Sequence, residues 1–308
     1  MVGLFAAVVG ATVLGCWLLG GDLARAVADR MKANTALGFV ITGGALALRA
    51  RRRTPALADV LAALGGVVGL LTLLEYGAGV DLGIDELLQR EHSALKEAER
   101  HPNRMAPNTA VALVLAGLAI FAASRGRVAV LLGQAFSVAL FFTGFTAGVG
   151  YLYEAVPLYQ PTVFIRMASL AALLATVMGA ACLVLRTDLG LARTLTRADA
   201  GGYVLRRALP MVVGLPVLAG WGRLALQQLG MVETVTGTAL LVVALTAVSA
   251  SMAVMLARSV IEADAQRRSS EQSLEASARL TAALSRATTV DEVARVVVHE
   301  GAATVGAR

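Results

Sequence analysis

Met31-Lys-Ala-Asn-Thr-Ala, Met105-Ala-Pro-Asn-Thr-Ala and Met167-Ala-Ser-Leu-Ala-Ala begin alike, and each segment opens an apolar run. A hydrophobic run and a short polar loop precede each of these methionines. A glycine follows each methionine at the same distance; these glycines are Gly43, Gly117 and Gly179. Because a repeat of this kind reports one structural unit used several times, the sequence predicts a pair of membrane helices joined by a loop and used three times.

The composition is that of a membrane protein. Hydrophobic residues make up 57% of the 308-residue chain and charged residues 16%, with a mean hydropathy of +0.71, whereas soluble domains carry roughly 25% charged residues. Apolar runs of about 18 residues or more can cross a bilayer. Such runs lie at about residues 2–21, 33–49, 56–78, 106–123, 128–150, 167–185, 208–229 and 235–257. We therefore predict an all-α integral membrane protein with eight transmembrane helices, three repeated pairs and a final hairpin, followed by a cytoplasmic connector helix.

The basic residues indicate how the predicted bundle is oriented. The net charge is +6, and the basic residues lie mostly in the C-terminal tail and in short loops that alternate with longer, more acidic loops. The loop arginines are Arg49, Arg51, Arg52, Arg53, Arg125, Arg127, Arg186, Arg193, Arg197, Arg206 and Arg207. Short basic loops stay in the cytoplasm, so we expect both termini to be cytoplasmic and expect no nucleic-acid partner. Arg25, Arg30 and Lys32 lie in an outer loop and are an exception to this rule.

Four regions follow from these runs. Residues 1–186 hold the three helix pairs, and residues 187–257 hold an inner linker and the hairpin. Residues 258–287 are polar and contain no proline or glycine, which predicts one continuous cytoplasmic helix. A heptad pattern along this helix, interrupted at Arg267 and Ser270, is compatible with a homodimer. A lone amphipathic connector is the alternative. Residues 288–308 are interpreted as the first helix of a truncated soluble domain.

Residue types that carry chemistry are scarce. The sequence contains no Walker loop, nucleophile elbow, HExxH motif or CxxC motif, so no catalytic activity and no cofactor are expected of this chain. The outer loop 79–104 is predicted to hold a short amphipathic helix. His92 and His101, with Glu91 and Glu97, would make a weak metal site. Their spacing fits no compact ligand set, so solvated loop residues are the favoured interpretation.

Polar residues gather at the predicted outer ends of the spans. They are Asn34, Thr35, Glu75, Tyr76, Asn108, Thr109, Tyr151, Tyr153, Arg166 and Arg223. Ionisable groups at such depth usually face a partner or a water-filled cavity, so we interpret the set as the rim of an outward-facing ligand cavity, with Glu75 paired to Arg166 or Arg223. The alternative is that the asparagines and threonines satisfy helix ends, and the tyrosines form an interfacial belt.

Several of these segments resemble the multi-pass N-terminal sensor regions of bacterial signalling proteins. They are Leu-Leu-Glu75-Tyr76-x-x-Gly79-x-Asp81-Leu-Gly-Ile-Asp85, Arg104-Met-Ala-Pro-Asn-Thr-Ala, Gly150-Tyr-Leu-Tyr, Leu158-Tyr159 and Gly220-Trp-Gly-Arg223-Leu. The tail from Leu280 to Ala294 is similar to the opening of a GAF domain. The chain departs from the pattern at Leu170-Ala171, where a polar pair is expected. The resemblance implies an input module in the bacterial inner membrane that precedes PAS or GAF domains and a histidine kinase, a nucleotide cyclase or a phosphatase.

Three functions remain open at this point. The leading hypothesis is a sensory input module that relays an outer-face or bilayer stimulus, such as an unknown small ligand, through the last span to a cytoplasmic output domain. The second is a small-solute transporter or channel, because helix-pair repeats also build transporters. The third is a passive membrane anchor that dimerises a cytoplasmic enzyme.

Overall fold

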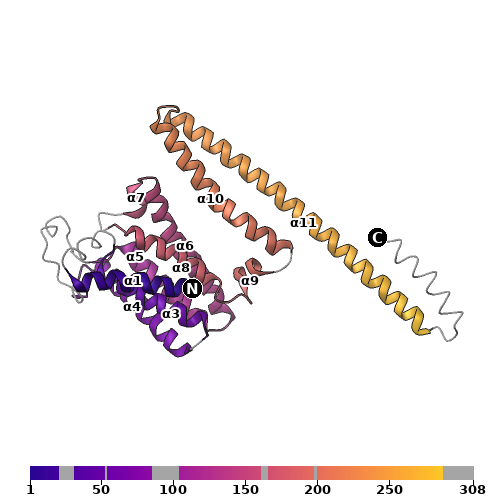
Figure 1. Cartoon of the computed structure of the whole chain (residues 1–308), viewed down its shortest axis with the longest axis horizontal. Helices are drawn as coiled ribbons and strands as arrows, with labels where there is room; N and C mark the ends of the chain where they lie inside the picture. Colours follow the sequence, from indigo (N-terminus) through magenta and orange to yellow (C-terminus); the bar gives the residue numbers. More distant parts are fainter. Residues whose placement is uncertain (21–30, 53, 85–103, 161–165, 198–199, 287–308) are drawn as a thin grey trace. The chain divides into compact units, whose positions relative to one another are not determined.

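The computed structural model describes residues 1–20, 31–52, 54–84, 104–160, 166–197 and 200–286. All regular secondary structure in these ranges is helical (Figure 1). The helices are α1 (Val2–Leu19), α3 (Ala33–Ala50), α4 (Pro55–Ala78), α5 (Pro107–Ala122), α6 (Arg127–Leu152), α7 (Val156–Tyr159), α8 (Ser169–Leu183), α9 (Gly190–Thr196), α10 (Ala200–Gln228) and α11 (Thr234–Arg286). The amphipathic helix predicted within 79–104, the histidines His92 and His101, and the tail 288–308 lie wholly or mainly outside the described residues.

Membrane character is evident in the length and apolarity of the helices. Five segments are long and apolar enough to cross a bilayer: α1, α4, α6, residues 201–228 of α10 and residues 234–255 of α11. The helices α5 and α8 are apolar but shorter, with 16 and 15 residues, and α3 has 18 residues, several of which are polar. The chain is therefore an all-helical membrane protein in the part that the structure describes, and a helix lies at each predicted run.

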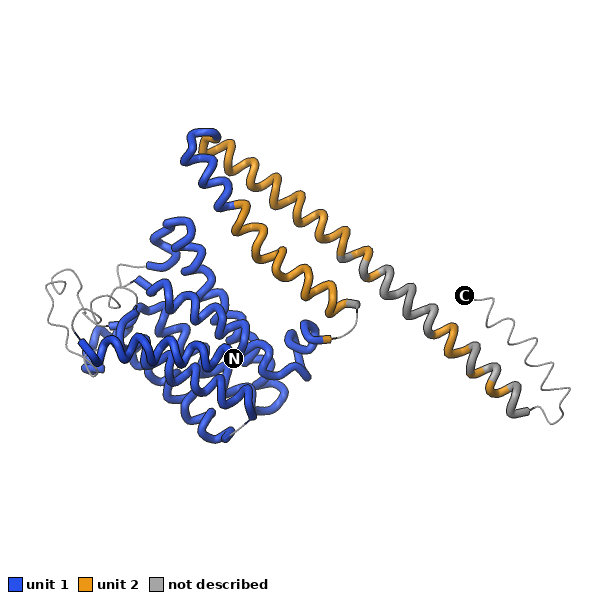
Figure 2. The backbone as a smooth tube through the Cα atoms, viewed as in Figure 1, with its two compact units in different colours: residues 1–196, 220–231 blue, residues 197–219, 232–308 orange. Residues whose placement is uncertain are grey.

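The chain divides into two compact units (Figure 2). The first unit comprises residues 1–196 and 220–231, and the second comprises residues 197–219 and 232–308. In the first unit the closest packing occurs between α1 and α3, α4 and α5, and α6 and α8. The pairs pack against one another through α3 with α4, α5 with α6 and α5 with α8. Proline begins both α4 and α5, where a missing N–H costs nothing.

One polar contact recurs in all three helix pairs. A ring near the end of the first helix donates a hydrogen bond to the backbone carbonyl of the methionine before the second helix. The three bonds are Trp17 Nε1 to Met31 O (2.9 Å), Tyr76 Oη to Met105 O (3.0 Å) and Tyr151 Oη to Met167 O. Each methionine is at most 1% exposed, and the residue after it is extended and caps the second helix. The ring thus supplies a buried carbonyl with the donor that no helix provides.

Glycine contacts recur in the same register. Seven residues before each ring stands a glycine whose added Cβ would lie within 2.7 Å of a carbonyl oxygen of the paired helix. These contacts join Gly10 to Ala36, Gly69 to Ala110 and Gly144 to Ala172. The repeat glycines make similar contacts from the second helix of each pair. Gly43 lies against the backbone of α1, Gly117 against that of α4 and Gly179 against that of α6. Small residues let membrane helices approach closely, so each pair is held by backbone-to-backbone packing at two levels.

The last helix of the second unit is unbroken. α11 runs for 53 residues, from the apolar segment 234–255 into a polar segment that ends at Arg286. At 1.5 Å per residue its length is about 80 Å. Its apolar side chains are largely uncovered by the chain itself; Val243, for example, is 65% exposed.

Candidate functional site

The end of the first unit at which α1, α4 and α6 finish and α3, α5 and α8 begin is called the methionine end. A buried ion pair lies there. Glu75, in the last turn of α4, is fully buried, and its Oε2 lies 3.5 Å from Nε of Arg104, whose side chain is 2% exposed. The structure thus gives Glu75 a partner that the sequence-based interpretation left out of the site, in place of the expected Arg166 or Arg223. Arg166 is exposed.

Tyr76 joins the ion pair to the repeated methionine contact. Its ring lies 5.3 Å from the guanidinium carbon of Arg104, close enough for a cation–π interaction. Its hydroxyl donates to the Met105 carbonyl, one residue beyond Arg104. The two residues therefore hold the extended segment before α5 against the end of α4.

The residues after α4 are folded back over Glu75. Gly79 ends the helix in a left-handed conformation (φ 66°), as is typical of a helix C-terminus. The backbone N–H of Leu82 then donates to Glu75 Oε1 (2.9 Å). Asn34, at the start of α3, donates to the Ile84 carbonyl (3.0 Å). The segment 79–84 therefore links the first two helix pairs through their polar groups.

The third helix pair has its own polar contacts at this end. The ring of Tyr151 stacks on that of Tyr159 with centroids 4.2 Å apart. The Tyr159 carbonyl accepts the Met167 N–H (2.9 Å), so Tyr151 and Tyr159 bind the carbonyl and the N–H of the same methionine. Tyr153 is half-buried, and its hydroxyl lies close to Gly220.

The remaining candidates fall into two groups. Thr35 and Thr109 are buried at 3% and 1% exposure, while Asn108 and Arg223 are half-buried. The structure thus brings Glu75, Tyr76 and Asn34 together around the segment 79–84. Tyr151 belongs to an equivalent contact in another pair.

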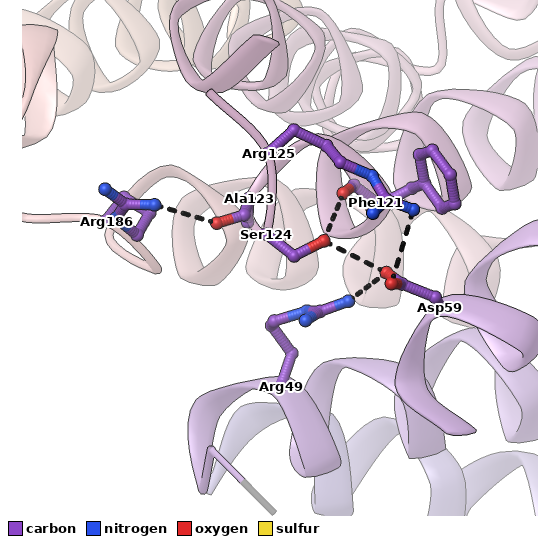
Figure 3. Close-up of polar contacts among 7 residues, drawn as sticks. All are labelled: Arg49, Asp59, Phe121, Ala123, Ser124, Arg125 and Arg186. Atoms are coloured by element: carbon purple, nitrogen blue, oxygen red, sulfur yellow. Dashed lines mark hydrogen bonds and ion pairs between the residues drawn. The ribbon is translucent and has the colours of Figure 1, made fainter. Parts of the chain in front are cut away.

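The opposite end of the unit, where α3, α5 and α8 finish, is called the arginine end. Its centre is Asp59 of α4, which the sequence-based interpretation did not single out (Figure 3). Asp59 pairs with Arg49 of α3 and with Arg125 (3.4 Å), and it accepts a hydrogen bond from Ser124 (3.1 Å). Arg125 also lies 4.2 Å over the Phe121 ring. One carboxylate therefore joins α3, α4 and the end of α5.

A second device at the arginine end fixes the chain beyond α8. Gln134 of α6 is 7% exposed, and its Nε2 donates to the carbonyls of Arg186 (3.3 Å) and Leu189 (2.9 Å). Its Oε1 accepts the Leu191 N–H (2.8 Å). Gly190 passes over this amide with φ 56°, and an added Cβ would lie 2.3 Å from Oε1. The amide thus holds the start of α9 to the bundle.

Comparison with protein-family models, with curated proteins and with solved structures finds no match to this chain. Among the described residues, no group of three or more histidine, cysteine, aspartate or glutamate side chains is placed to hold a metal ion. At the methionine end one buried ion pair holds the segment before α5 to the end of α4, and Asn34 joins the first helix pair to the segment 79–84. The residues described there include no nucleophile beside a base.

Proposed function

We propose that this chain is the membrane-embedded sensory input module of a bacterial signal-transduction protein of the histidine-kinase type. In this proposal eight helices cross the inner membrane as three copies of one helix pair and a hairpin. Both termini are cytoplasmic, and the connector helix 258–287 forms a homodimer that leads to a GAF-like output domain. The observation that carries the proposal is that α11 passes without a break from an apolar segment into a polar one.

An unbroken helix transmits motion well. A rotation or shift of residues 234–255 in the bilayer moves the polar half of α11 with it, because no glycine or proline interrupts the i to i−4 hydrogen bonds between Thr238 and Arg286. The apolar half is largely uncovered by its own chain, which leaves it free to contact lipid or a second copy. A passive anchor has no need of such continuity.

The repeated contacts support the three-copy architecture. The ring-to-methionine hydrogen bond and both glycine contacts recur at matching positions in α1–α3, α4–α5 and α6–α8. The third copy keeps them although Leu170-Ala171 replaces the polar pair at its start. The arginine loops then lie on one face, which the positive-inside rule assigns to the cytoplasm.

The input would act at the methionine end. The Glu75–Arg104 pair is buried and holds the segment before α5 to the end of α4, and a buried charge whose partner is removed costs about 3–5 kcal/mol. A ligand or a change in the bilayer that separates these groups must therefore stabilise the separated state, relative to the paired state, by a comparable free energy. This makes the pair a candidate for the element with two discrete states.

An insertion series tests the relay. Residues 1–286 are fused to a histidine-kinase catalytic region, and one to seven alanines are inserted between Arg258 and Glu271. Each added residue rotates the downstream helix by about 100°. We expect autophosphorylation in membrane vesicles to oscillate with insert length and to recover at seven residues, where the heptad phase is restored.

Matched controls separate the competing functions. The same alanines are also added in the Gly230–Glu233 turn, outside the connector helix. This control tests whether a disturbed entry of the chain into the membrane is enough to alter activity. A flat profile between Arg258 and Glu271 would mean that the chain is only an anchor. Substrate-dependent flux in proteoliposomes would instead identify a transporter.

A further inference from the structure

A cavity opens at the arginine end of the first unit, away from the ion pair of the proposed sensor. Its volume is about 460 Å³, within the range of roughly 300–1,000 Å³ that small-molecule sites occupy. Its lining residues are Leu48, Arg49, Arg52, Pro55, Ala123, Leu185, Arg186, Thr187 and Asp188. Three guanidinium groups and one carboxylate therefore share a single hollow between the ends of α3, α5 and α8 and the start of α4.

One of these arginines is buried with an unused donor. The Arg49 side chain is 10% exposed, and its Nε–H has no acceptor among the described residues. Its Nη2 is committed to Asp59. Buried guanidinium donors are normally all satisfied, so this N–H is a donor that a bound anion could use.

The opposite wall is positioned by a separate set of contacts. Arg186 donates a hydrogen bond from Nη1 to the Ala123 carbonyl (3.2 Å) (Figure 3). It also donates from Nε (2.8 Å) and Nη2 (2.7 Å) to the Asp188 carboxylate. This contact and the charge of Arg52 hold the pKa of the Asp188 carboxyl at about 2, below its ordinary value. Asp188 is therefore ionised at neutral pH and occupies donors that a bound anion would use.

We propose that this cavity, which we call the arginine pocket, binds the phosphate group of an anionic ligand. Arg52 and Arg186 contact the phosphate oxygens from two sides, and Arg49 Nε supplies the buried donor. Phosphate suits the site because planar guanidinium groups donate to its oxygens in pairs. The arginine pocket would bind phosphate whether or not the chain is a sensor.

Two sources could present this phosphate. One is an anionic phospholipid, since basic pockets at the cytoplasmic ends of membrane helices bind such headgroups. The other is a soluble phosphate from the cytoplasm. A phospholipid would place its headgroup among the arginines and its acyl chains along the exposed apolar surface of the helices, which includes the 48%-exposed Leu57 of α4.

The test uses the purified chain in detergent. Native mass spectrometry measures binding of phosphatidylglycerol and of phosphatidylcholine with the same acyl chains, and a thermal-shift assay measures inorganic phosphate against chloride at equal ionic strength. We expect Arg52→Gln to weaken phosphate-group binding about tenfold, the loss of one charge-assisted hydrogen bond. We expect Asp188→Asn to strengthen it about threefold, because a competing acceptor is removed.

The matched control is Arg127→Gln, which removes an exposed arginine at the same end but outside the lining. It should leave binding within about twofold of the original. Arg52-dependent binding of phosphatidylglycerol assigns the site to lipid, and Arg52-dependent binding of inorganic phosphate without a lipid preference assigns it to a soluble ligand. Equal effects of Arg52→Gln and Arg127→Gln, or no binding in either assay, would overturn the proposal. Asp188→Asn decides the matter independently should Arg52→Gln not fold.

Discussion

The two ends of the helical bundle use charge in opposite ways. At the methionine end one carboxylate and one guanidinium are sealed from solvent, with side-chain exposures of 0% for Glu75 and 2% for Arg104. At the arginine end the pairs are partly open: Asp59 is 19% exposed, Arg125 47% and Asp188 58%. Both ends join the same helices, so the two ends differ mainly in how far their charged side chains are exposed to solvent.

This difference decides how each end responds to its surroundings. A sealed pair feels little screening and fails abruptly when one partner is lost. An open cluster is screened by salt and can exchange one partner for another, including a bound anion. The methionine end is therefore suited to hold one of two states, whereas the arginine end is suited to bind a ligand.

The largest expected effect comes from breaking the sealed pair. Glu75→Leu removes the buried carboxylate that pairs with Arg104, so we expect a loss of about 3–5 kcal/mol in the free energy of unfolding. Glu75→Leu combined with Arg104→Leu should recover most of that loss, because no buried charge remains. Unfolding in detergent followed by circular dichroism measures these two variants and the single variant Arg104→Leu. A double variant as unstable as the two single losses added together would contradict a direct pair.

The next largest effect tests the close packing of α6 against α8 between the two ends of the bundle. Gly144→Ala places a Cβ 2.4 Å from the Ala172 carbonyl oxygen, and overpacking of this kind costs about 1–3 kcal/mol. Gly148→Ala is the control on the same helix, because nothing lies within 4 Å of its added Cβ. We expect the control to be neutral or slightly stabilising, since alanine favours helix. Equal thermal stability of the two variants would contradict a close contact at Gly144.

The smallest effect is that of the open cluster. Asp59→Asn should cost about 1–2 kcal/mol in dilute buffer, because Arg49 and Arg125 lose a charged acceptor. Raising the salt concentration toward about 1 M should shrink this difference while leaving the Glu75→Leu difference unchanged. Unfolding at two salt concentrations measures the contrast. The same salt response at both ends would show that burial does not distinguish them.

Much of the fold was predictable from local pattern. A helix lies at every predicted apolar run, and the run predicted at 33–49 forms α3 over Ala33–Ala50. The helices α10 and α11 extend well beyond the runs predicted for them. The run predicted at 167–185 begins two residues too early, since α8 starts at Ser169. Hydropathy counts Met167 as helical, but its carbonyl is bound by Tyr151 and the residue after it is extended.

The candidate site was predictable only in part. Glu75 stands out in the sequence as an acidic residue at the end of an apolar run, and Tyr76 and Asn34 share its depth. Arg104 and Asp59 were missed because a basic or acidic residue beside a polar loop looks solvated in sequence. Gln134 was missed because its role depends on three backbone groups of a distant linker. The methionine–glycine spacing was visible, whereas the rings that bind the methionines were not matched to it.

The sequence by itself determined that this chain forms apolar helices, because hydrophobic runs are a property of neighbouring residues. The tertiary structure alone decided which charges meet. Glu75 and Arg104 are separated by a loop, and the partners of Asp59 come from α3 and from the end of α5. Electrostatic pairing depends on distance and burial in three dimensions, and neither is written in the order of the residues.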